Sequence, residues 1–228
     1  MMEAIFNTPY FGLVLCIGTY LIGLWVQKKT KWLLANPLMI AVLLSIGVIL
    51  LLDIPYEWFN KGGSILQMML GPVTALLALG IYNQRAVLKE YFIPVLAGCL
   101  AGSVTSIVSV LALCRVFGVD KAVTAALMPK SCTTPIAVSI AESHGGLAAI
   151  AAFAVVITGV IGALCAPLFS KWFGIKDPVA QGLATGASSH ALGTTRAREM
   201  GEVQGAVSSI AIGVCGLISV VLSLFVKI

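Results

Sequence analysis

Two short polar segments interrupt an otherwise apolar chain and hold most of the side chains that could bind a small solute. The first is MPKSCTTP at residues 128–135, in which Pro129 and Pro135 enclose a lysine and three hydroxyl groups. A proline has no backbone N–H and disturbs the helical turn before it, so irregular backbone is expected here. A helix that begins near Pro135 would point free N–H groups and its positive dipole end at the same place. These features predict a site for an anion such as a carboxylate, formed by Lys130, Ser131, Thr133 and Thr134.

The second segment, GLATGASSHALGTTRA at residues 182–197, has a similar polar composition. Gly186 and Gly193 permit close backbone approach and unusual dihedrals. His190 titrates near neutrality, so it could bind substrate or accept a proton. The expected substrate-binding residues of this segment are Thr185, Ser188, Ser189, His190 and Thr194. Structural alternatives stay open for both segments, because lysines extend to membrane surfaces, hydroxyls cap helices, and histidines and glycines pack between helices.

Charged residues close both polar segments. Glu142 follows the first, and Arg196 and Glu199 end the second. Each carboxylate could form an ion pair with a nearby cation or bind a coupling ion, and a plain loop charge is the alternative. We expect no cofactor, and H⁺ and Na⁺ are the candidate coupling ions.

The composition predicts that the whole chain lies in a membrane. Hydrophobic residues make up 59% of the 228 residues and charged residues only 10%, whereas soluble domains are about 45–50% apolar and about 25% charged. Six runs approach or exceed the roughly 17–25 apolar residues that span a bilayer as a helix. We therefore expect an all-α polytopic membrane protein with a single transmembrane domain over 1–228. Its first run is expected to be a spanning helix and not a cleaved signal peptide. The runs are 10–26, 32–52, 63–82, 91–117, 146–169 and 203–226.

The regions around the polar segments, 121–142 and 178–198, do not have the composition of ordinary spanning helices. Each is expected to be a broken spanning helix or a re-entrant hairpin that enters and leaves by one face. One limb of a hairpin that reaches the middle of a roughly 30 Å hydrocarbon core needs about ten helical residues. Each of the two regions is about as long as two such limbs. Re-entrant hairpins also place Lys171 and Lys176 with the other basic loops, which the positive-inside bias favours.

An inverted repeat would agree with this topology. Ser131 and Ser188 stand at equal intervals before Glu142 and Glu199, so one shift superposes hairpin plus helix on hairpin plus helix. The candidate units are 121–173 and 178–228, and the pattern is weak because the chain is rich in small residues. Many secondary transporters build a midplane site from broken helices of two inverted units.

Other functional classes are disfavoured by the residues that are present. The six cysteines stand singly, without a CxxC pair, and there are only two histidines, so a metal site is not expected. No GxSxG, HExxH or P-loop pattern occurs, which disfavours an enzyme. The net charge of +5 is expected to set loop orientation in the membrane rather than to bind nucleic acid.

The two motifs together resemble the LrgB/CidB family of bacterial membrane proteins. The residues that carry this resemblance are MPKSCTTPIA at 128–137, GLATGASSHALGTTRA at 182–197, NPL at 36–38, GG at 145–146 and EVQGAVSS at 202–209. The resemblance implies a multi-pass protein of the bacterial inner membrane, described as antiholin-like or holin-like, that modulates murein hydrolase activity. It also implies a small LrgA/CidA-type membrane partner. Plant relatives are plastid translocators of glycolate and glycerate, and bacterial members are linked to pyruvate transport.

Two functional hypotheses follow. The first is a secondary transporter of small monocarboxylates, which works by alternating access with a midplane site between the two broken segments. The alternative is an antiholin-like regulator of murein hydrolases and autolysis that acts with the small partner. With either function we expect the protein to lie in the bilayer, to form a homo-oligomer and not to bind nucleic acid. A small carboxylate is the expected substrate under the transporter hypothesis.

Overall fold

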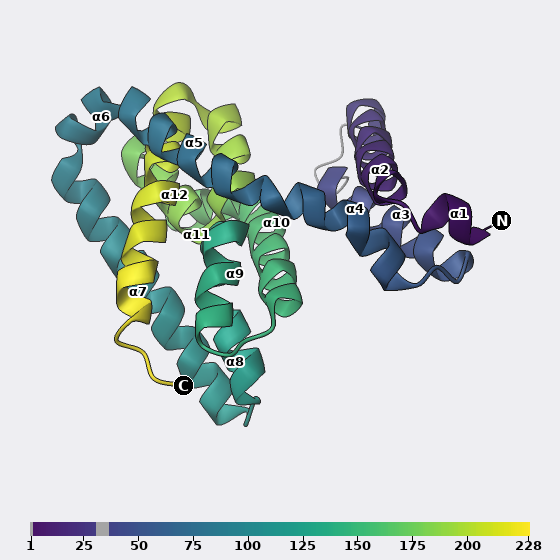
Figure 1. The fold of residues 1–228 in the computed structure, drawn as a ribbon. Coiled ribbons are helices and arrows are strands. Elements are labelled where there is room, and N and C mark those ends of the chain that lie inside the picture. Colours follow the sequence, from purple (N-terminus) through teal and green to yellow (C-terminus); the bar gives the residue numbers. More distant parts are fainter. Residues whose placement is uncertain (1, 31–36) are drawn as a thin grey trace. The chain divides into compact units, whose positions relative to one another are not determined.

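A computed structural model describes residues 2–30 and 37–228, and every regular element within these ranges is an α-helix (Figure 1). The predicted all-α fold of a polytopic membrane protein is confirmed. In chain order the helices are α1 (Met2–Phe6), α2 (Pro9–Thr30), α3 (Pro37–Leu51), α4 (Tyr56–Met68), α5 (Leu70–Asn83), α6 (Arg85–Glu90), α7 (Phe92–Val116), α8 (Lys121–Leu127), α9 (Thr134–Ser143), α10 (Ala148–Trp172), α11 (Pro178–Met200) and α12 (Glu202–Ser223).

Four of the described helices are long and apolar enough to cross a bilayer, namely α2, α7, α10 and α12. They match four of the six expected spans, those at 10–26, 91–117, 146–169 and 203–226. The expected span at 32–52 is described only from residue 37, where α3 is a shorter apolar helix of 15 residues. Residues 32–36 lie outside the described residues, and with them Asn36 of the NPL motif.

The expected span at 63–82 differs from a single helix. Its residues are divided between α4, which ends at Met68, and α5, which begins at Leu70. Pro72 lies in the first turn of α5, where a missing N–H is tolerated. In a continuous helix the ring of Pro72 would clash with the carbonyl of Met68. The proline therefore accounts for a new helix start within this apolar run.

The chain divides into two compact units, Met1–Val73 and Thr74–Ile228. In the first unit α2 packs against α3 and α4, and the hydroxyls of Thr19 and Ser45 lie 3.1 Å apart. An apolar cavity of about 690 Å³ lies among these three helices. The single transmembrane domain expected over 1–228 stays a prediction.

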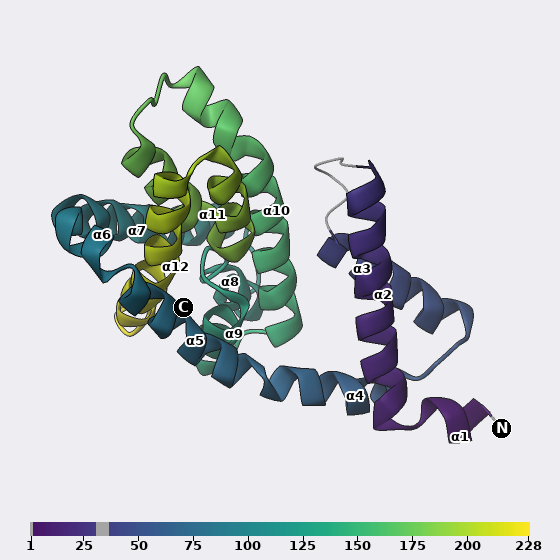
Figure 2. The same ribbon diagram turned by 90° about the horizontal axis from the view of Figure 1, so that it is seen from above.

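In the second unit α7 and α12 both run from the upper to the lower part of the view in Figure 1, and Figure 2 shows the same helices from above. Val95 near the start of α7 packs in one cluster with Val207 near the start of α12. Ile107, farther along α7, packs in another cluster with Leu222 near the end of α12. The positions of both polar segments are described below relative to this pair of helices.

The first polar segment folds as a hairpin of α8 and α9 joined by residues 128–133. Lys121, at the start of α8, donates from Nζ to the Ile228 carbonyl at 3.4 Å. His144, just after α9, donates from Nε2 to the Ser223 carbonyl at 3.0 Å. Both contacts lie at the C-terminal end of α12, so the hairpin enters and leaves by that end of the unit.

The second polar segment also folds back on itself, because α11 bends sharply at His190. Gly182, before the bend, packs against Gln204, and Arg198, after the bend, packs against Gly205. Both limbs therefore lie along the first turns of α12. This hairpin enters by the end of the unit opposite to that of the first. Each segment was predicted to be either a broken spanning helix or a re-entrant hairpin, and both fold back on themselves. Their assignment to an inverted repeat stays a prediction.

Candidate functional site

The bends of the two hairpins reach the middle of the long helices beside them. At the first bend, the Ser131 hydroxyl lies 2.8 Å from the hydroxyl of Ser106, which is near the middle of α7. At the second bend, Ser189 packs against Gly162, which is near the middle of α10. Two segments that enter from opposite ends thus bring polar groups to the same level.

The first bend leaves its side chains free to face a cavity. After Pro129 the chain makes a tight turn, closed by a hydrogen bond from the Cys132 N–H to the Pro129 carbonyl at 2.9 Å. Thr133 is extended, and α9 begins after it with Pro135 in the first turn, a position that tolerates a missing N–H. Lys130, half-buried, lies with Nζ 3.5 Å from the Ser131 hydroxyl.

The second bend is held by its own backbone and by α10. His190 has φ 40° and ψ −133°, a region that residues with a Cβ rarely occupy. Its Nε2–H donates to the Val155 carbonyl at 2.9 Å. A Cβ on Gly159 would approach the His190 ring, and one on Gly162 would overlap the Ser189 hydroxyl. The two α10 glycines therefore provide the space that the second bend occupies.

A cavity of about 870 Å³ lies where the two hairpins, α7 and α10 meet. Lys130 and Ser131 line it from the first hairpin, and Ser188 lines it from the second. Most of the remaining lining is apolar or glycine, and Lys130 carries the only charge among the described residues around it. Such a chamber can hold one small anion whose apolar part faces the helices and whose charge faces the lysine.

Several predicted site residues lie elsewhere, with hydroxyl groups that bond locally. Thr185 donates to the Gln181 carbonyl at 2.7 Å within its own helix. The hydroxyls of Thr194 and Ser208 lie 2.7 Å apart and join α11 to α12. The Ser189 hydroxyl lies 2.9 Å from that of Ser188. A binding role for these residues, and for His190, stays a prediction.

The remaining predicted residues of the two segments, Thr133, Thr134, Gly186 and Gly193, do not line the cavity. The Thr133 hydroxyl is buried and has no hydrogen-bond partner among the described residues. Thr134 is half-buried in the first turn of α9. Gly186 and Gly193, of the second segment, pack against Ser208 and Thr185 respectively. The roles predicted for these residues also stay predictions.

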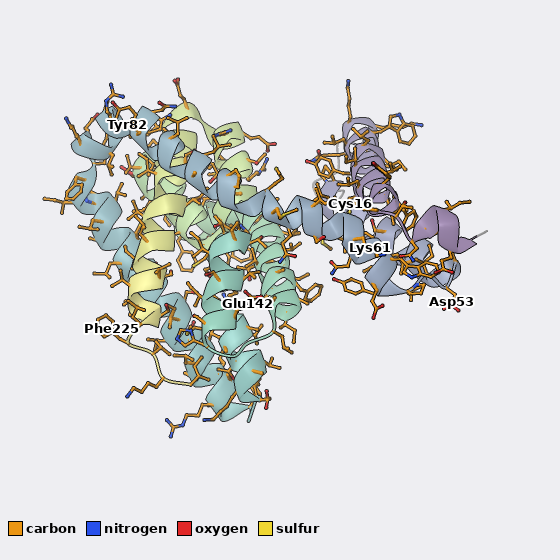
Figure 3. The ribbon with its side chains drawn as sticks, viewed as in Figure 1. Cys16, Asp53, Lys61, Tyr82, Glu142 and Phe225 are labelled. Carbon is orange, nitrogen blue, oxygen red and sulfur yellow. The ribbon has the colours of Figure 1, made fainter. Side chains whose placement is uncertain are left out.

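Of the charged residues that close the segments, Glu142 and Glu199 are exposed and Arg196 is half-buried. Arg196 and Glu199 form an ion pair across one turn of α11. Glu142 is exposed on the last turn of α9 (Figure 3) and forms no ion pair within the described residues. None of the three lines the cavity. A coupling role for them therefore stays a prediction, and it would not involve contact with an anion bound in the cavity.

Sequence reasoning missed the contribution of α7 and α10 to the cavity. Thr105 and Ser106 line it from α7, and Thr158 lines it from α10. The SVTS run at 103–106, in the middle of an apolar span, was the available signal. Hydroxyls at membrane depth in a helix are also explained by bonds to the preceding turn, so this run did not stand out.

The fold and the cavity define the class of this protein. It is an all-helical membrane protein in which two helical hairpins enter from opposite ends and line one cavity with residues near their bends. The chain matches the LrgB-like family over residues 16–228 and belongs to that family. It is 39% identical to the antiholin-like protein LrgB of Bacillus subtilis (strain 168) over 97% of this chain and 96% of the relative. The protein of the same name from Bacillus mycoides (strain KBAB4) is 40% identical over 94% of both chains. No solved structure matches the chain.

Proposed function

We propose that this protein is an antiholin-like regulator in the bacterial inner membrane that restrains murein hydrolase activity and autolysis. The observation that carries the proposal is similarity over almost the whole chain to relatives with the antiholin-like name, at 39% identity to one of them. Those relatives' names support regulation more directly than transport, so the order of the two sequence-based hypotheses is reversed. A small LrgA/CidA-type membrane protein is the proposed partner, and no covalent chemistry is involved.

The regulatory proposal is tested in cells that lack the gene. We expect faster detergent-induced lysis and stronger murein hydrolase bands in zymograms, and both should return to normal when the full chain is expressed. Expression of the chain in cells that also lack the small partner should restore neither. Unchanged lysis and unchanged zymograms in the deletion strain would contradict the proposal.

The cavity favours a second candidate function, secondary transport of a small monocarboxylate. Lys130 is half-buried in a mainly apolar chamber of about 870 Å³ at the meeting point of the hairpins. A lone buried cation is costly unless a counter-ion pairs with it. One carboxylate supplies that counter-ion, and the Ser131 hydroxyl, which also lines the cavity, can donate to its second oxygen. A dicarboxylate would leave one negative charge unpaired, because Lys130 is the one charged residue that lines the cavity within the described residues.

Alternating access is the proposed mechanism of transport. Because the hairpins enter from opposite ends, a movement of one hairpin opens the cavity to one face while the other hairpin closes the second face. H⁺ and Na⁺ are the proposed coupling ions. The two functions are compatible if a changed flux of carboxylate is what changes autolysis.

Transport is tested with purified protein in liposomes and labelled pyruvate, glycolate or lactate. We expect saturable uptake that Lys130→Ala abolishes, because the substituted cavity has no charge to offset that of the anion. Lys171→Ala is the matched control, since Lys171 is exposed and does not line the cavity. Equal uptake by the two variants would refute the binding role of Lys130. If Lys130→Ala still restores normal autolysis in cells, regulation does not require transport.

A further inference from the structure

A second polar cavity, of about 520 Å³, lies outside the site described above. It is formed by α6, the start of α12 and the last turn of α11. The charged residues that line it are Arg198, Glu90 and Glu202. Among the described residues none of these three forms an ion pair. The cavity therefore combines one cation and two carboxylates outside any ion pair, of which Glu90 interacts with the neighbouring Tyr91 hydroxyl.

Arg198 is positioned to bind a phosphate. It packs over Gly205, where a Cβ would collide with the arginine side chain. Its Nη2 donates to the Ser209 hydroxyl at 3.5 Å, a single long hydrogen bond that leaves the rest of the guanidinium available. A guanidinium is a planar fork of donors that matches phosphate oxygens in pairs.

The two carboxylates provide the complementary half of a zwitterion site. Glu90 ends α6, Glu202 begins α12, and both side chains are exposed at the cavity. Carboxylates accept hydrogen bonds from a primary ammonium group, which has three donors. A ligand that carries a phosphate and an amine a few bonds apart would satisfy both signs of charge in one cavity.

The place of the cavity in the fold indicates where such a ligand comes from. It lies at the N-terminal ends of α7 and α12, two helices long enough to cross a bilayer, and hence at the level of the lipid headgroups. Apolar side chains next to it are exposed, with Phe92 52% and Val203 43% accessible. Acyl chains can therefore continue from the cavity along the two helices.

We propose that this cavity binds the headgroup of a phospholipid with a primary amine, the chemistry of phosphatidylethanolamine. Arg198 binds the phosphate, and Glu90 and Glu202 bind the ammonium group. The site is separate from the cavity that contains Lys130, with which it shares no lining residue.

Native mass spectrometry of the delipidated full chain tests this site, with phosphatidylethanolamine, phosphatidylcholine or phosphatidylglycerol added back at equal mole fraction. We expect phosphatidylethanolamine to be retained about tenfold more than phosphatidylcholine, whose methylated amine cannot donate hydrogen bonds. Arg198→Gln should lower that retention about tenfold, and Glu202→Gln should reduce the preference between the two lipids. Arg85→Gln removes the same charge from the start of α6, outside the cavity, and should change nothing.

Several results would overturn the proposal. Equal retention of the three lipids, a preference for phosphatidylglycerol, or an equal loss in Arg85→Gln would show that the cavity does not recognise the headgroup. Soluble glycerophosphoethanolamine that binds as tightly as the lipid would assign the site to a free phosphoester. If Arg198→Gln does not fold, Glu202→Gln decides the question, because its side chain is exposed.

Discussion

The two hairpins reach the same level from opposite ends, but their bends are built differently. The first has a stretch of non-helical chain at residues 128–133, and its Lys130 and Ser131 line the cavity. The second bends at the single residue His190, whose side chain is buried against α10. The first bend exposes Lys130 and Ser131 to the cavity, whereas the second contributes Ser188 to it and buries Ser189 and His190 against α10.

The two hairpins differ in which residues allow the bend. Prolines break the first hairpin from within, because they remove backbone donors at the bend itself. The second is accommodated from outside, by Gly159 and Gly162 on the neighbouring helix. Substitutions should therefore affect mainly stability at the second bend and mainly ligand binding at the first.

The largest expected effect is at Gly162, where an added Cβ would overlap the Ser189 hydroxyl. We expect Gly162→Ala to lower the free energy of unfolding by about 1–3 kcal/mol, because overpacking forces one of the two helices to shift. The melting temperature of the purified protein in detergent measures this effect.

Two companion variants make the Gly162 experiment decisive. Gly18→Ala is the control, because a Cβ there meets nothing within 4 Å and should leave stability unchanged or raise it by up to about 1 kcal/mol. Ser189→Gly removes the side chain that the new methyl group would meet, so the double variant should recover stability relative to Gly162→Ala alone. Without that recovery, the second bend does not depend on the glycine.

The next effect concerns the backbone of His190. At φ 40° and ψ −133° a residue with a Cβ is strained by about 1–3 kcal/mol, whereas glycine is not. Both His190→Ala and His190→Gly lose the hydrogen bond to Val155, but only the alanine keeps the strain. We therefore expect the alanine variant to be less stable than the glycine variant by about 1 kcal/mol, in thermal melting. In a regular helix the order is the reverse, so an alanine variant that is the more stable of the two would show that α11 has no such bend.

Composition and hydropathy were sufficient for the fold class, because burial in lipid requires apolar helices whatever their tertiary contacts. They failed at 63–82, where the hydropathy of the run continues across the break between α4 and α5. Hydropathy reports the surroundings of a segment, while Pro72 determines where its backbone can be continuous. Both kinds of information are in the sequence, but only Pro72 indicates the break within this apolar run.

The cavity could be predicted only in part. Lys130, Ser131 and Ser188 were identified because their polarity contrasts with their surroundings. Thr185 and Thr194 look the same in the sequence, yet their hydroxyls bond to Gln181 and Ser208. Whether a hydroxyl faces a chamber or a neighbouring helix depends on the rotation of that helix, which polar composition does not specify.

A smaller effect tests how firmly the first bend is fixed. The Ser106 and Ser131 hydroxyls are the hydrogen-bonded contact between this bend and α7. A double-mutant cycle of Ser106→Ala and Ser131→Ala should give a coupling of about 0.5–1.5 kcal/mol in the free energy of unfolding, which is typical of a neutral hydrogen bond. A coupling near zero would mean that the bend is already free of α7. In that case the two hairpins would differ in mobility even more than in packing.

The smallest effect separates the charges that close the hairpins. The pair of Arg196 and Glu199 is one turn apart and partly exposed, with side chains 29% and 54% accessible. Such pairs contribute only about 0.2–0.5 kcal/mol, so Glu199→Gln should barely change the melting temperature. Glu142→Gln should change it even less, since no described residue pairs with Glu142.

The readout that separates the two roles of these carboxylates is uptake in liposomes. A carboxylate that binds a coupling ion would abolish uptake against a gradient when neutralised, although stability is unchanged, whereas a surface charge would leave uptake intact. Because neither carboxylate lines the cavity, we expect intact uptake in both variants, and its loss in one would identify the hairpin that carries the ion.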